Sequence, residues 1–194
     1  MGYRIQTSGD SVQFTDVYTP ANVTQPALGA IRVRDERFGS FNKTLITLDN
    51  VGQSVVNGTE YQSTKIFTFP EGRILVLGVT ATLKQKTTSA LASTLNASST
   101  GAIALGTAAA TNVSLTSTMV DLLPSTAFTS SATVNVAGTA VSAALAASAQ
   151  FDGTTTAKPV YLNTAYATTT DVDADATQTI SGTVAIAWVF LGDY

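Results

Sequence analysis

The sequence predicts an all-β protein: an antiparallel β-sandwich, jelly-roll-like, with at most one short helix. Two observations carry this prediction. Apolar residues recur with a period of two in several segments, which is the period of a strand and not of a helix. Gly, Pro and Asn residues typical of turns separate those segments, and no long amphipathic helix can be read between them.

The clearest strand is the C-terminal segment TQTISGTVAIAWVFLGDY, residues 177–194. Successive side chains of a strand point to opposite faces. One face therefore carries large apolar residues, namely Ile180, Val184, Ile186, Trp188 and Phe190. The opposite face carries small ones, among them Ala185, Ala187 and Val189. A small second face indicates partial burial against another sheet, a subunit or a neighbouring loop. Of these we expect a subunit, with the last three residues at the seam of an oligomer.

Earlier strands follow the same alternation. Residues 41–50 place Leu45 and Thr47 against Ile46 and Leu48. Residues 64–86 hold two strands joined by a turn at 70–72, where Pro presets φ and Gly accepts a positive φ. The second of these strands is expected to emerge into water at Lys84, Gln85 and Lys86. Shorter strands are predicted near 102–108, 133–136 and 159–163.

One segment leaves helix and strand open. Residues 140–150, AVSAALAASAQ, have the Ala and Leu density of a helix, and we allow one short helix there. The Thr-rich flanks favour strands on both sides.

The chain divides into two parts, an extended N-terminal arm over residues 1–40 and a sandwich domain over residues 41–194. The arm concentrates cations in IRVRDERFGS, residues 31–40. A solvated loop is the first interpretation of this segment. The functional alternative is an arm that lies on an acidic surface of a partner, which Arg32, Arg34 and Arg37 would bind.

Composition excludes several classes of function. The 194 residues contain no Cys and no His, which removes thiolate chemistry and every Ser-His-Asp or Cys-His arrangement. The net charge of −3 without a dense basic patch argues against a nucleic-acid partner. No apolar run reaches the length of a membrane-spanning helix. Charged residues make up 12% of the chain, which is low for a free monomer and indicates that a partner covers part of the surface.

An acidic stretch offers the one candidate for a metal. Asp171, Asp173 and Asp175 occupy alternate positions, as at the start of a calcium loop. The remaining pattern fails, because Ala176 stands where an EF-hand needs Gly and Gly182 where it needs Glu. A solvated acidic turn is the prediction and a weak calcium site the alternative. Neither catalytic residues nor a cofactor are predicted.

Three stretches together resemble a family. They are KIFTFPEGRILVLG at 65–78, ALGTAAATNVSLTSTMVDLLPS at 104–125 with FDGTTTAKPVYLN at 151–163, and DVDADATQTISGTVAIAWVFLGDY at 171–194. They are similar to the head decoration, or cement, proteins of tailed bacteriophages. The resemblance covers roughly residues 40–194 and consists of strand and turn patterns. It implies a β-sandwich, usually an oligomer and often a homo-trimer, on the outer surface of the capsid, where it binds the major capsid protein and stabilises the shell.

Other functions predict other features. A carbohydrate-binding or adhesive β-sandwich on a phage or cell surface would show an exposed aromatic cluster. An enzyme built from Asp, Glu, Ser, Tyr or Lys would need two convergent carboxylates in a cleft. A major coat subunit would need a longer helix than any readable in this sequence.

Overall fold

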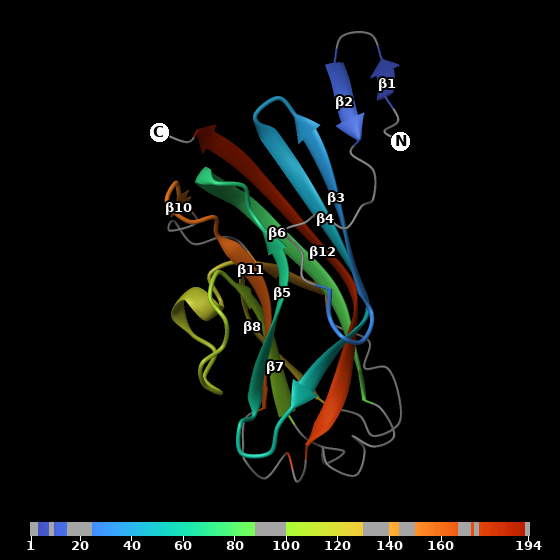
Figure 1. The fold of residues 1–194 in the computed structure, drawn as a ribbon, viewed down its shortest axis with the longest axis vertical. Helices are drawn as coiled ribbons and strands as arrows, with labels where there is room; N and C mark the ends of the chain where they lie inside the picture. Colours follow the sequence, from blue (N-terminus) through green and yellow to red (C-terminus); the bar gives the residue numbers. More distant parts are fainter. Residues whose placement is uncertain are drawn as a thin grey trace.

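The computed structural model describes residues 4–7, 10–14, 25–87, 100–129, 140–143, 150–166, 172 and 175–192. Over these residues the chain consists of strands and loops, and the one helical element is a 3-10 turn, Ser117–Met119. The strands form two antiparallel sheets that pack on each other (Figure 1). The predicted all-β sandwich is therefore confirmed.

The larger sheet contains eight strands. Its order is β1 (Arg4–Thr7), β2 (Asp10–Phe14), β3 (Ala30–Phe38), β4 (Phe41–Val55), β12 (Ala176–Gly192), β6 (Gly72–Thr87) and β10 (Gln150–Gly153), with β9 (Ala140–Ala143) also paired to β6. The C-terminal strand β12 thus lies between β4 and β6 and pairs with both along most of its length.

The smaller sheet contains four strands. Its order is β5 (Tyr61–Thr68), β11 (Pro159–Tyr166), β7 (Thr100–Gly106) and β8 (Leu123–Thr129). Across the two sheets the pairing is nested, because β4 pairs with β12, β5 with β11, β6 with β10, and β7 with β8. Each of these early strands therefore pairs with a later one in reverse order. From β4 to β7 and from β10 to β12 the chain alternates between the two sheets.

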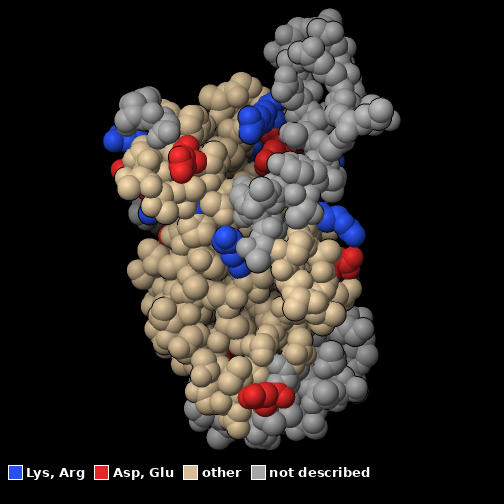
Figure 2. All heavy atoms as spheres, viewed as in Figure 1, with Lys and Arg blue, Asp and Glu red and all other residues tan. Residues whose placement is uncertain are grey.

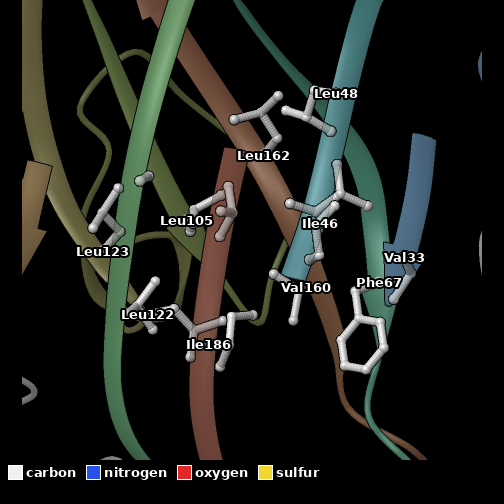
Figure 3. Close-up of a cluster of buried hydrophobic side chains, with 14 of the residues drawn as sticks. Val33, Ile46, Leu48, Phe67, Leu105, Leu122, Leu123, Val160, Leu162 and Ile186 are labelled. Atoms are coloured by element: carbon white, nitrogen blue, oxygen red, sulfur yellow. The ribbon is translucent and has the colours of Figure 1, made fainter. Parts of the chain in front are cut away.

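The core fills the space between the sheets. Figure 3 shows side chains from both sheets meeting there, with Ile46 and Leu48 of β4 and Ile186 of β12 opposite Leu105 and Leu162 of the smaller sheet. Trp188 is 3% exposed, stacks edge-on with Phe69 and donates its indole N–H to the hydroxyl of Thr44 at 2.9 Å. The large face of the C-terminal strand is thus buried as its alternation predicts, up to Trp188.

The far side of the smaller sheet is covered by residues 107–122. Leu115 and Met119 of this segment pack on Ala104 and Ala165 of the sheet. The side-chain amide of Asn163 donates to the carbonyls of Ala108 and Met119, at 2.9 and 2.8 Å. The two central strands of this sheet, β11 and β7, are therefore buried over most of their length.

Several expectations differ from the structure. Ala30–Phe38, predicted as part of an extended arm, form β3 and pair with β4 over nine residues. Ala140–Ala143, where a helix was allowed, form strand β9. Gln85, expected in water beside Lys84, is buried. The strand predicted at 133–136 lies outside the described residues.

Candidate functional site

The side of the larger sheet that points away from the smaller sheet is called the outer face here. Strands β3, β4, β12 and β6 contribute alternate side chains to it, and the residues between them are buried in the core. The register fixes the lateral neighbours. Four rows cross the outer face: Arg32, Thr47, Thr183 and Thr82; Arg34, Leu45, Ala185 and Thr80; Glu36, Lys43, Ala187 and Gly78; Phe38, Phe41, Val189 and Leu75.

This register decides how the predicted surfaces relate. Arg34 lies two strands from Ala185 in the same row, so the predicted capsid-binding and oligomer-seam residues share one face. Adjacent strands are about 4.8 Å apart, so these two residues lie roughly 10 Å from each other. Arg37 does not belong to the outer face. It has the opposite parity in β3 and pairs with Asn42 on the inner side of the sheet.

Charges gather along β3 and β4. The carboxylate of Glu36 contacts the guanidinium of Arg34 at 2.5 Å and the ammonium of Lys43 at 3.6 Å, and its side chain is 12% exposed. Arg32 forms a looser pair with Asp49 at 3.7 Å. Figure 2 shows charged side chains gathered in the upper half of that view, above a broad uncharged area. The exposed pair of Arg32 with Asp49 contributes little to stability.

One end of the outer face is apolar. Phe38 and Phe41 lie next to each other with ring centroids 6.3 Å apart, and their row continues through Val189 to Leu75. Leu77 is the extra residue of a bulge in β6 beside this row. Phe38 is 47% exposed and Leu77 is 49% exposed. Large apolar side chains collected at one end of a face are typical of a protein-binding surface.

The acidic candidates are not brought together as a metal site. Asp171 and Asp173 lie outside the described residues. Asp175 is exposed and accepts a hydrogen bond from the backbone N–H of Asn57 at 2.9 Å. Over the part of the chain that the structure describes, no group of three or more acidic side chains is placed to hold a metal ion. Nor does any helix in that part have the length and hydropathy to cross a membrane.

A buried polar layer between the sheets was missed by sequence reasoning. Three glutamines from neighbouring strands of the larger sheet form it with two residues of β11: Gln53, Gln178, Gln85, Thr164 and Tyr166. Gln178 donates to the side-chain oxygens of Gln53 at 3.0 Å and Thr164 at 2.9 Å. It accepts from Gln85 at 2.8 Å and from the Tyr166 hydroxyl at 2.5 Å.

The signal for this layer was strand parity. Gln85 and Gln178 share the face of Leu83 and Ile180, so alternation alone places them inside. The polar side chains are tolerated there because they bond to one another on adjacent strands and across the core, although the side-chain oxygen of Gln85 has no hydrogen-bond partner. A network of this kind fixes the register of three strands, since a slip of one residue would turn the glutamines to the opposite face.

Two aspartates have pKa values that differ from the usual range in opposite directions. Burial raises the pKa of Asp121, although its carboxylate accepts hydrogen bonds from the N–H and the hydroxyl of Thr107. Hydrogen bonds from the hydroxyl and the N–H of Thr154 lower the pKa of the exposed Asp152. Each carboxylate thus accepts hydrogen bonds from a threonine of a nearby loop, and the two carboxylates do not form a pair.

The two aspartates predict opposite effects of pH on stability. Asp121 binds its proton more tightly in the folded state, so its contribution is complete below its ordinary pKa of 3.8 and is lost as the pH rises through its folded pKa. Asp152 stabilises the folded state above pH 3.8, its ordinary pKa, and this contribution to stability is lost as the pH falls through its lowered folded pKa. We expect Asp121→Asn to gain stability relative to the wild type as the pH rises from about 3 to about 6. Urea unfolding across this range, with carboxyl titration by NMR, measures the effect, and a pH-independent difference would contradict the assignment.

Comparisons of the chain with protein-family models, with curated proteins and with solved structures gave no match. The function of the protein is therefore inferred from its sequence and from the geometry of its outer face.

Proposed function

We propose that the protein is a non-enzymatic virion structural protein that binds the outer surface of a tailed-phage capsid and stabilises the shell. The observation that carries this proposal is the asymmetry of the sandwich. The smaller sheet is covered by residues 107–122, whereas the outer face of the larger sheet keeps an exposed apolar end beside a row of charges. A protein whose distinctive feature is a contact surface is suited to binding.

We also infer that the sandwich is a jelly roll. The support is the nested pairing of β4 with β12, β5 with β11, β6 with β10 and β7 with β8, which is what a long hairpin rolled into two sheets produces. Jelly-roll sandwiches are frequent in viral capsid and lectin domains. The chain's only tryptophan, Trp188, is buried and cannot stack on a sugar, whereas Phe38 and Phe41 form a partly exposed aromatic pair of the kind that the carbohydrate-binding alternative predicts.

The mechanism in this proposal is selective binding. A protein that binds the assembled lattice and not the free subunits shifts the equilibrium towards the lattice by mass action. A homo-trimer would present three contact surfaces at once, and the repetition of a weak contact over a symmetric shell makes the total attachment strong. No catalytic step is needed.

Cosedimentation tests the proposal directly. We expect the purified chain to sediment with assembled capsids of the phage that encodes it, to reach saturation, and to raise the temperature at which those capsids disassemble. Unassembled capsid subunits are the matched control and should not retain the chain. If the chain does not sediment with the assembled capsids even when it is in large molar excess over the capsid subunits, the proposal is overturned.

A further inference from the structure

The outer face carries a charge opposite in sign to that of the whole chain. Five cations among its described side chains point from it, Arg32, Arg34, Lys43, Arg73 and Lys84, and two acids, Glu36 and Asp49, so the formal charge of these side chains is 5 − 2 = +3. The whole chain is −3, and the remainder is therefore −6. A face-to-face pair of two copies would bring +3 against +3, whereas an acidic partner surface would be attracted.

The four rows named above give a lower bound on the size of the face. Four strands at about 4.8 Å spacing and four rows at about 6.8 Å spacing cover roughly 500 Å², and the rows of Asp49 and Lys84 extend the face beyond them. A stable pair of proteins buries about 800 Å² on each side. The four rows alone fall short of this area, and the binding of several copies to one assembly strengthens a contact of that size.

The apolar end supplies the part of the contact that excludes water. Phe38 and Leu77 are the most exposed of its side chains, and Phe41, Leu75 and Val189 lie half-buried between them. Aromatic and aliphatic side chains grouped beside a polar rim have the composition of an interface centre.

Resting on the capsid-binding function proposed above, we propose that the outer face is a single docking surface, with its apolar end at the centre of the contact and Arg32, Arg34, Lys43 and Lys84 at its rim. Its partner is the assembled coat, which would present an apolar patch flanked by carboxylates. Ala185, Ala187 and Val189 then contact the coat, and they do not form a seam between copies of this chain.

The test compares two substitutions of exposed apolar residues. Leu77→Glu changes the apolar end of the outer face, while Val113→Glu changes the segment that covers the smaller sheet, where Val113 is 37% exposed. We expect Leu77→Glu to weaken cosedimentation with capsids by about tenfold or more and Val113→Glu to leave it unchanged. Lys84→Glu should weaken binding too, and wild-type binding should fall with added salt. Thermal unfolding of each variant verifies that it is folded.

The outcomes separate this inference from the function on which it rests. If wild-type protein binds capsids and Leu77→Glu binds equally well, the docking surface is overturned and the function stands. If Leu77→Glu lowers the oligomer mass measured by light scattering, from a multiple of 20.0 kDa to 20.0 kDa, a second copy occupies the face and the inference is overturned. If the wild-type protein binds no capsid, the proposed function fails and this inference with it.

Discussion

Gly182→Ala is expected to prevent stable folding. Gly182 lies in β12 with φ at +140°, a conformation that other residues rarely adopt, and a Cβ there would overlap the carbonyl oxygen of Thr82 on β6. Neither strand can withdraw, because β12 is hydrogen-bonded on both sides, to β4 and to β6. We expect a loss of about 4 kcal/mol or more in the free energy of unfolding, or protein that stays insoluble.

Gly39→Ala is the matched control for this substitution. Gly39 also has a positive φ, at +63°, but a Cβ at this position would meet nothing within 4 Å. We expect a loss of about 1 kcal/mol, which is the conformational term alone. Urea denaturation of both variants measures the difference, and equal losses would show that the close approach of β6 to Gly182 has no energetic consequence.

Gln178→Ala is expected to destabilise the protein by about 3 kcal/mol. Gln178 is fully buried and satisfies both its amide donor and its carbonyl acceptor through four neighbouring side chains. Removing its amide takes one buried hydrogen bond from each of four side chains: Gln53, Gln85, Thr164 and Tyr166. The cost of these lost hydrogen bonds adds to that of the cavity left by the shortened side chain.

A second substitution separates the two causes. Gln178→Met keeps most of the side-chain volume and removes the hydrogen bonds, so we expect most of the loss to persist. Thr183→Ala, an exposed position on the same strand, should change stability by no more than about 0.5 kcal/mol. Wild-type stability for Gln178→Met would show that the polar layer does not stabilise the fold.

The outer face shows how far sequence reasoning reaches at the proposed site. Alternation along β3 was sufficient to separate Arg32 and Arg34 from Arg37, and treating this segment as an arm hid that signal. The arrangement of Arg34 beside Ala185 could not be predicted, because the two residues are 151 positions apart in the chain and meet only through β4. Local patterns carry no information about which strands become neighbours.

The sequence by itself determined the strands and the faces that they bury. Alternation in β12, the turn at 70–72 and the absence of helical periodicity are properties of consecutive residues, and sterics act on consecutive residues directly. Local patterns could not predict the insertion of β12 between β4 and β6, the meeting of its Gln178 with Gln53 and Gln85 in one layer, or the placement of two predicted surfaces on one face. These features depend on pairings between distant segments, which are selected by the packing of the whole sandwich and not by any local preference.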